Sequence, residues 1–175
     1  KKYKFINTNN YIIINSKPIY DNIDYCVYEE DNKVYRVFYR PCEESPYACL
    51  VIDKEIKNYY ICYIYTKNIS GNLSISNLFD IMAIEYAMIR LNTIILHSSF
   101  ICYENKAVLF SAPSGIGKST QANLWNQYKK CEIINGDRTF LNKINDRWMA
   151  HGSPYAGSSR IFKNKSFSLG NIILL

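Results

Sequence analysis

The first 70 residues alternate short apolar runs with clusters of polar turn residues. Apolar runs bounded in this way predict strands, and they cover residues 11–14, 25–28, 34–39, 48–52 and 59–65. We expect 25–28 and 34–39 to form a hairpin with a four- or five-residue loop between them. The pattern therefore predicts a small antiparallel β unit over residues 1–70, without a Gly-rich loop or a cluster of potential ligands.

A longer apolar segment follows the β unit. Ser74 or Ser76 is suited to cap a helix over residues 77–91, because a serine hydroxyl accepts a hydrogen bond from the first helical turn. The apolar residues of this segment surround almost its whole circumference, so we expect the helix to be buried between layers. Glu85 and Arg90 on it are interpreted as structural polar groups.

Strands and a helix alternate in the rest of the chain. A helix begins at Lys118, and strands are predicted over 93–97, 100–103, 107–110, 131–135, 138–141 and 148–150, with 100–103 paired to 107–110 and the last two joined around Asn145-Asp146. The turn Ser70-Gly71-Asn72 separates this part from the β unit, so we expect an α/β fold with a second domain over residues 71–175. The apolar run 170–175 looks like the start of a buried strand, which favours a chain truncated at its C-terminus.

Composition narrows the classes of protein. The 175 residues are 48% hydrophobic, yet no stretch approaches the roughly 18 apolar residues of a membrane span, and the basic N-terminus lacks the apolar region of a signal peptide. The net charge of +6 is dispersed, which indicates solvated surface rather than a nucleic-acid interface. The six cysteines have no metal-binding spacing, so we expect reduced thiols in a cytoplasmic protein.

The most informative segment is residues 112–119, Ala-Pro-Ser-Gly-Ile-Gly-Lys-Ser, which fits the Walker A spacing with Ala112 in place of the first glycine. Glycines let backbone N–H groups turn toward phosphate oxygens, and the helix that follows adds partial positive charge. Lysine reaches the β- and γ-phosphates, and the next hydroxyl binds Mg²⁺. We therefore expect ATP or another nucleoside triphosphate with Mg²⁺, bound by Ser114, Gly115, Ile116, Gly117, Lys118, Ser119 and Thr120.

A nucleotide site of this kind needs a second metal ligand and a group that handles a proton. Asp137 follows a strand, and ligands gather at strand ends in open α/β sheets, so it is the expected partner of Ser119, as a metal ligand or as a general base. His97 also ends a predicted strand and is a second candidate for the base. Arg138 either stabilises transferred charge or pairs with a carboxylate.

These residues carry a family resemblance. His97-Ser98-Ser99-Phe100, the 112–119 segment and the strand that closes on Asp137 together resemble the catalytic domain of the HPr serine kinase/phosphorylases, over about residues 93–140. The resemblance implies a fold related to phosphoenolpyruvate carboxykinase, with the phosphate loop against a mostly antiparallel sheet. It also implies ATP- and Mg²⁺-dependent phosphorylation of a serine on a protein or peptide. Segments 135–138 and 152–157 look more like the HPr-kinase-related proteins found beside peptide-modification systems.

The chain departs from the family at one place. An acidic pair divides base and metal duties in the family, whereas here Gly136 or Asn135, depending on a one-residue gap, replaces the first acid. Asp137 would then serve both duties, or His97 would act as the base, or catalysis would be lost. The family's C-terminal segment, which contributes substrate contacts and oligomerisation, would lie beyond Leu175.

Three functions are consistent with these residues. The first is a kinase in which Lys118, Arg138, Asp137 and His97 act on ATP and an acceptor serine. The second is a nucleotide-binding accessory protein with little turnover, which the missing acid permits. The third is a small-molecule kinase on the same scaffold. We expect a protein or peptide partner that carries an acceptor serine, and neither nucleic acid nor membrane. A homo-oligomer is also consistent with the resemblance.

Overall fold

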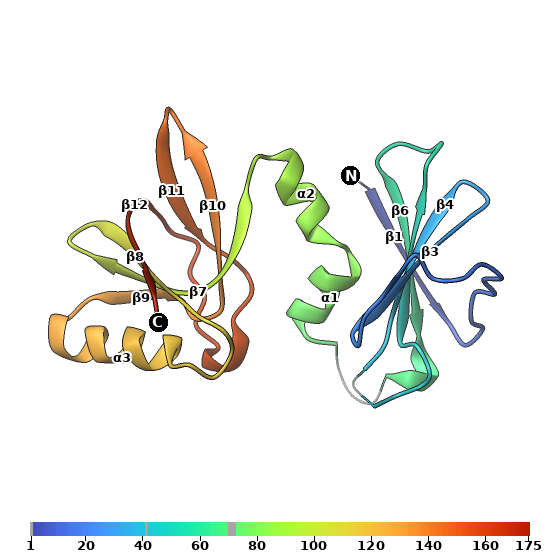
Figure 1. The fold of residues 1–175 in the computed structure, drawn as a ribbon, viewed down its shortest axis with the longest axis horizontal. Coiled ribbons are helices and arrows are strands. Elements are labelled where there is room, and N and C mark those ends of the chain that lie inside the picture. Colours follow the sequence, from blue (N-terminus) through green and yellow to red (C-terminus); the bar gives the residue numbers. More distant parts are fainter. Residues whose placement is uncertain (1, 41, 70–72) are drawn as a thin grey trace. The chain divides into compact units, whose positions relative to one another are not determined.

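The chain forms two compact units, Lys1–Ile84 and Glu85–Leu175, in a computed structural model that describes residues 2–40, 42–69 and 73–175 (Figure 1). The described residues contain two six-stranded sheets and three α-helices, a mixed α/β composition. The domain boundary expected after residue 70 lies in 70–72, outside the described residues, and it stays a prediction. No helix of the described part is long and apolar enough to span a bilayer.

The sheet of the first unit has the order β1-β6-β5-β4-β3-β2. Its strands are β1 (Lys2–Thr8), β2 (Tyr20–Asp21), β3 (Tyr25–Glu30), β4 (Lys33–Phe38), β5 (Ala48–Asp53) and β6 (Tyr59–Tyr65). The expectation of a wholly antiparallel unit is wrong, because β1 pairs with β6 in parallel. The sequence pattern missed β1, an edge strand in which lysine and asparagine interrupt the apolar residues.

The strand predicted over residues 11–14 is also absent, although two of its side chains are partly buried. Ile12 and Ile14 pack against the cluster that contains Val37 and Tyr65, and the Ile12 N–H donates to the Tyr65 hydroxyl at 3.3 Å. Ile13 between them is 83% exposed. The segment therefore alternates inward and outward like a strand, but no named strand forms a ladder with it.

The predicted hairpin of β3 and β4 is confirmed, but its loop has two residues rather than four or five. Glu30 pairs directly with Lys33, and Asp31 and Asn32 between them both have positive φ, 48° and 58°. This is the backbone of the two-residue turns that match strand twist. The sequence pattern assigned the charged residues Glu29, Glu30 and Lys33 to the loop, although they belong to the ends of the two strands.

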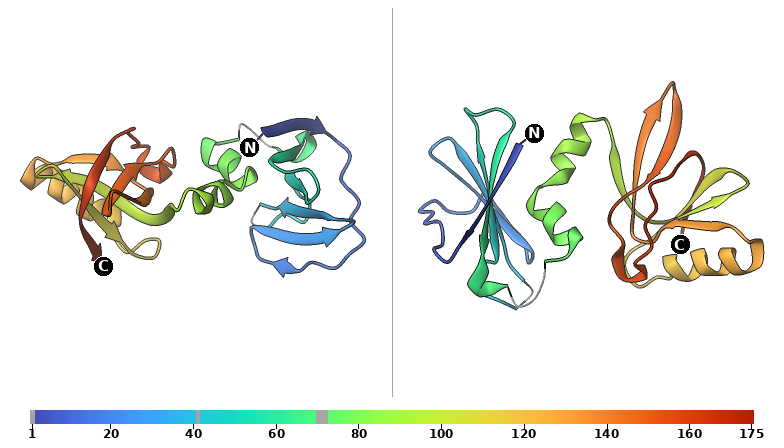
Figure 2. Two further views of the ribbon diagram at one scale, coloured as in Figure 1. Left: turned by 90° about the horizontal axis from the view of Figure 1, so that it is seen from above. Right: turned by 180° about the vertical axis from the view of Figure 1, so that it is seen from behind.

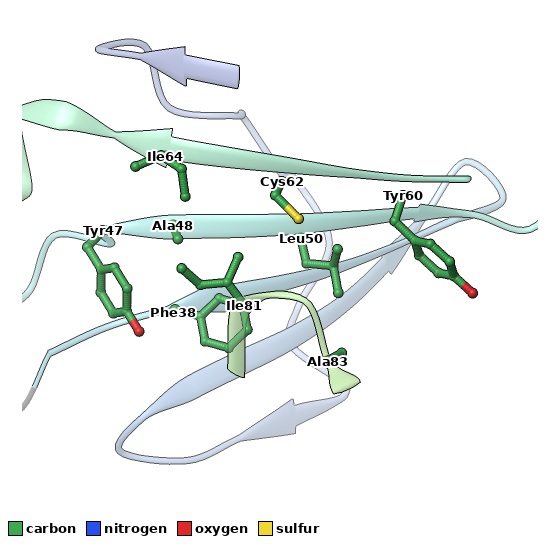
Figure 3. Close-up of a cluster of buried hydrophobic side chains, with 9 residues drawn as sticks. All are labelled: Phe38, Tyr47, Ala48, Leu50, Tyr60, Cys62, Ile64, Ile81 and Ala83. Atoms are coloured by element: carbon green, nitrogen blue, oxygen red, sulfur yellow. The ribbon is translucent and has the colours of Figure 1, made fainter. Parts of the chain in front are cut away.

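One face of this sheet is covered by α1 (Ile75–Ile81), which Ser74 caps through a capping box with Asn77. Ile81 and Ala83 join a buried hydrophobic cluster with Leu50 and Phe38 from the strands (Figure 3). The single helix expected over 77–91 is wrong: Ala83 takes a left-handed φ of 48° and separates α1 from α2 (Ile84–Arg90). No glycine or proline marks this break in the sequence.

The strands of the second unit close into a ring. They are β7 (Ile94–Tyr103), β8 (Lys106–Ser111), β9 (Glu132–Asn135), β10 (Arg138–Ile144), β11 (Arg147–Gly152) and β12 (Ser166–Leu174). The sheet order is β10-β11-β12-β8-β7-β9, and β10 also pairs with β7, which completes the ring. β8 and β12 are parallel, and the other pairs are antiparallel. The strand expected at the C-terminus is confirmed as β12, but its end is not buried, since Ile172 and Leu174 are exposed. The expected continuation beyond Leu175 stays a prediction.

Two apolar clusters stabilise this unit. One lies among the strands of the ring and includes Phe100, Leu109 and Ile134. The other packs α3 (Lys118–Lys129) against β7, β8 and β9 (Figure 2). In this cluster Trp125 meets the rings of Tyr103 and Phe110 edge-on. The helix predicted to begin at Lys118 is therefore confirmed. Because α3 packs on these strands, its first residue is held close to the end of β8.

Candidate functional site

The segment that fits Walker A forms the connection between β8 and α3, and we call residues 112–117 the candidate phosphate loop. Gly115 and Gly117 have φ of 85° and 109°, which only glycine adopts without strain. A Cβ added to Gly115 would meet no atom within 4 Å, so the backbone here borders open space. Gly117 is the N-cap of α3, whose helix dipole adds partial positive charge where the loop ends.

Lys118, the first residue of α3, is only 7% exposed. Its Nζ donates to the carbonyl oxygens of Ala112 and Pro113, both at 3.0 Å. The ammonium group is thereby held across the mouth of the candidate phosphate loop by the loop's own backbone. A charge held in this way needs little reorganisation to exchange these carbonyls for phosphate oxygens.

Asp137 lies near the candidate phosphate loop, at a point where strand pairing is interrupted. β9 and β10 both run antiparallel to β7, with Asn135 opposite Phe100 and Arg138 opposite His97. Gly136 and Asp137 lie between the two ladders, where the Asp137 carbonyl still accepts from the Ser98 N–H at 2.9 Å. His97 is therefore inside the long strand β7 and does not end a strand, which corrects that expectation.

Three charged or titratable side chains meet at this interruption. His97 Nε2 lies 3.6 Å from Asp137 Oδ1, and Arg138 Nε lies 3.7 Å from Asp137 Oδ2. The guanidinium of Arg138 stacks 4.3 Å from the ring centre of the buried Tyr155, which fixes its direction. The Asp137 side chain lies between His97 and Arg138, and it is 25% exposed, with one side open to the cavity described below.

The pKa of His97 is lowered from its ordinary value of 6.5. Partial burial is the main cause, and the positive charge of Lys118 acts in the same direction, with a smaller contribution from Arg138. The Asp137 carboxylate opposes this shift because it favours the imidazolium. His97 is therefore neutral near pH 7 and able to accept a proton.

A cavity of about 270 Å³ brings these groups together. Its lining residues come from the loop, from α3, from β7, from the 136–137 interruption and from the short 3₁₀ helix Gly157–Ser159. They are His97, Ser114, Gly115, Gly117, Lys118, Ser119, Thr120, Gly136, Asp137 and Ser158. Of the residues expected from sequence, Ile116 and Arg138 do not line it; Ile116 is 57% exposed. Sequence reasoning missed Ser158.

The packing beside Asp137 leaves no room for an acid at position 136. A Cβ on residue 136 would lie 1.8 Å from the hydroxyl oxygen and 2.7 Å from the Cβ of Ser159, so the Ser159 side chain occupies the place where a side chain at 136 would lie. A Cβ on Gly157 would lie 2.8 Å from the Asp137 Cβ, so that glycine lets the turn approach the aspartate directly. Gly157 also has a left-handed φ of 55°. Asp137 is thus the single carboxylate among the described residues that line the cavity.

The donor set fits Mg²⁺ bound together with a polyphosphate. Mg²⁺ in such sites takes one or two protein oxygens, and phosphates and water complete its coordination. Ser119 and Asp137 offer one hydroxyl and one carboxylate in the same cavity. The described residues contain no group of three or more His, Cys, Asp or Glu side chains that would hold a metal without phosphate.

Comparison with known proteins gives little beyond this geometry. No protein-family profile matches the chain, and no curated protein matches it. Among solved structures, the HPr(Ser) kinase/phosphatase from Coxiella burnetii is similar with a TM-score of 0.38 and 15% identity, over 46% of this chain and 58% of that one. The chain thus spans less than two thirds of that neighbour, and the likeness is a distant one at the level of fold. The case for function therefore rests on the site itself.

Proposed function

We propose that this protein is an ATP- and Mg²⁺-dependent kinase that phosphorylates a serine, or a similar hydroxyl, on a protein or peptide. The observation that carries the proposal is one cavity that joins the candidate phosphate loop to the His97–Asp137 pair, whose side chains lie 3.6 Å apart. Phosphoryl transfer depends mainly on positioning and charge stabilisation, which these groups supply. The peptide or protein acceptor is supported by the resemblance of residues 93–140 to the HPr serine kinase/phosphorylases.

The geometry supports a role for each of these residues. The N–H groups of residues 114–118 would surround the phosphates, and Lys118 would exchange its two carbonyl partners for phosphate oxygens. Ser119 and Asp137 would hold Mg²⁺, which neutralises the charge that develops on the phosphates. The acceptor oxygen forms a bond to the γ-phosphorus while the bond to ADP breaks. The acceptor proton passes to Asp137 or to His97, which is neutral because its pKa is lowered.

One observation favours a second candidate. Since Gly136 leaves no space for the first acid of the family pair, the site has one carboxylate where the family has two. An accessory protein that binds nucleotide and turns it over slowly would need no more than one carboxylate. The two candidates differ in turnover and agree in nucleotide binding.

The deciding experiment measures ADP formation from Mg·ATP with and without a library of serine-containing peptides. Asp137→Asn keeps the shape of the side chain but loses the charge that Mg²⁺ requires and the ability to accept a proton. We expect it to lower turnover about 10²–10⁴-fold, the usual range for loss of a general base, and to weaken metal-free nucleotide binding far less.

Two controls frame this measurement. Asp146→Asn makes the same chemical change in the β10–β11 turn and should retain parental turnover. Lys118→Ala should lose nucleotide binding itself, because it removes the ammonium group from the loop. Near-parental turnover in Asp137→Asn would favour the accessory protein over the kinase.

A further inference from the structure

Asn135 is a fully buried amide at the end of β9, two residues before Asp137. Its Oδ1 accepts from the backbone N–H groups of Asp137 and Arg138, at 2.8 and 2.9 Å. Its Nδ2 donates to the carbonyl oxygens of Ser153 and Tyr155, at 2.8 and 2.9 Å. Both ends of the amide are therefore occupied by backbone groups from two segments far apart in sequence.

These two segments are the ones that determine where the Asp137 carboxylate lies. The first is the interruption between β9 and β10, which carries Asp137 itself. The second leads from Tyr155 to the turn Gly157–Ser159, where Gly157 packs directly against the Asp137 side chain. The Asn135 amide ties one to the other, since a single planar group bonds to both.

We propose that Asn135 is a positioning residue that holds Asp137 toward the candidate phosphate loop, and that only an amide can do this. The proposal rests on the kinase function proposed above and deepens it, because it explains why the site has one acid. An amide offers donors on one side and an acceptor on the other, which matches two carbonyls and two N–H groups. A carboxylate at this position would direct oxygens at the carbonyls of Ser153 and Tyr155 without a hydrogen to share.

The resemblance to the HPr serine kinase/phosphorylases allows the opposite prediction. If Asn135 occupied the place of the missing family acid, N135D would restore the acidic pair and raise turnover. If Asn135 positions Asp137, N135D lowers turnover at pH 8 by about 10–100-fold, the usual effect of removing a partner that orients a metal ligand. The two hypotheses therefore differ in the sign of the effect of one substitution.

A second readout does not depend on catalysis. Calorimetric titration with ADP, with Mg²⁺ and without it, measures how much the metal strengthens nucleotide binding. N135D should leave metal-free ADP affinity unchanged and reduce the gain from Mg²⁺ about 10–100-fold, because Asp137 no longer faces the loop. If the parent binds Mg·ADP but transfers no phosphoryl group, the kinase function fails while this titration still tests Asn135.

Two further variants complete the design. N126D changes an amide that donates to the Cys131 carbonyl outside the cavity, and it should match the parent in both readouts. If N135D does not fold, as judged by thermal unfolding, N135S replaces it, since a hydroxyl retains one acceptor and one donor. We expect N135S to show a smaller reduction of the Mg²⁺-dependent gain. A folded N135S or N135D with parental turnover and a parental Mg²⁺-dependent gain would overturn the proposal.

Discussion

The hairpins of the two units are built in the same way. Asp31-Asn32 joins β3 to β4 in the first unit, and Glu104-Asn105 joins β7 to β8 in the second, each with two consecutive residues at positive φ. The units differ in how their ladders continue. β3, β4, β5 and β6 pair without a shift in register, whereas β7 pairs first with β10 and then with β9 across the interruption at 136–137.

The candidate chemistry lies at that interruption. A regular ladder points alternate side chains to opposite faces, so it spaces them evenly and brings few polar groups together. The break at Gly136-Asp137 turns one carboxylate toward the start of α3 and lets Gly157 pack behind it. The first unit has a somewhat larger hollow of about 330 Å³, lined by Glu43, Glu44, Ser45, Lys67 and Asn68, but it joins no Gly-rich loop. Volume is therefore a poorer guide to the site here than irregular backbone.

Matched core truncations test whether the two sheets support different properties, and they have the largest expected effect. Leu50 and Leu109 are both fully buried, one in each unit. Leucine to alanine in such positions costs about 2–5 kcal/mol of unfolding free energy. We expect Leu50→Ala to leave ADP affinity unchanged, and Leu109→Ala to reduce it severalfold, because β8 carries the candidate phosphate loop.

Chemical denaturation and calorimetric ADP titration, both below the unfolding temperature, give the two quantities. The comparison between the units fails if Leu50→Ala weakens ADP binding as much as Leu109→Ala does. The comparison is supported most strongly if Leu109→Ala loses ADP affinity while its folded fraction equals that of the parent.

Much of the first unit follows from local pattern. The strands β3, β5 and β6 and the capped start of α1 were predicted because apolar runs and a serine cap are properties of neighbouring residues. The parallel partner of β6 was not predicted, since β1 is identified only by its pairing with a strand 57 residues away in sequence. The break at Ala83 was missed for a related reason: packing of Ile81 and Ala83 onto the sheet outweighs the continuous helical pattern.

The site shows the same limits. The candidate phosphate loop follows from adjacent residues, and the structure places it between a strand and a helix as expected. Asp137 was expected near Ser119 by an argument for parallel sheets, yet it reaches the cavity through a break in an antiparallel ladder. Asn135 and Gly157 act through groups in distant segments, so spacing along the chain could not reveal them. The assigned roles stay predictions until the variants are measured.

A pH profile tests the electrostatics at the interruption. As a proton acceptor, His97 must be neutral, so kcat/KM should fall as the pH drops through its pKa in the free enzyme. Burial and the charge of Lys118 lower that pKa, so the midpoint of this fall should lie below 6.5. Measurement of kcat/KM for ATP at saturating Mg²⁺ gives the midpoint directly. His97→Ala should lose this step of the profile, and a parental midpoint above 6.5 would mean that Asp137 dominates the environment of the imidazole.

The smallest expected effect compares the turns that the units share. Glu104 and Asp31 hold equivalent places, with φ of 47° and 48°, but aspartate visits left-handed backbone more readily than glutamate does. Left-handed backbone costs an ordinary residue about 1–2 kcal/mol, and glycine relieves this strain while adding about 0.5–1 kcal/mol of unfolded-chain entropy. Glu104→Gly should therefore stabilise the second unit by about 0.5 kcal/mol, and Asp31→Gly should stabilise the first by less.

Denaturation midpoints measure both changes in stability. ADP affinity should equal that of the parent in each variant, because neither turn touches the cavity. If Asp31→Gly were the more stabilising of the two, the strain in these turns would depend on the unit around them rather than on the residue.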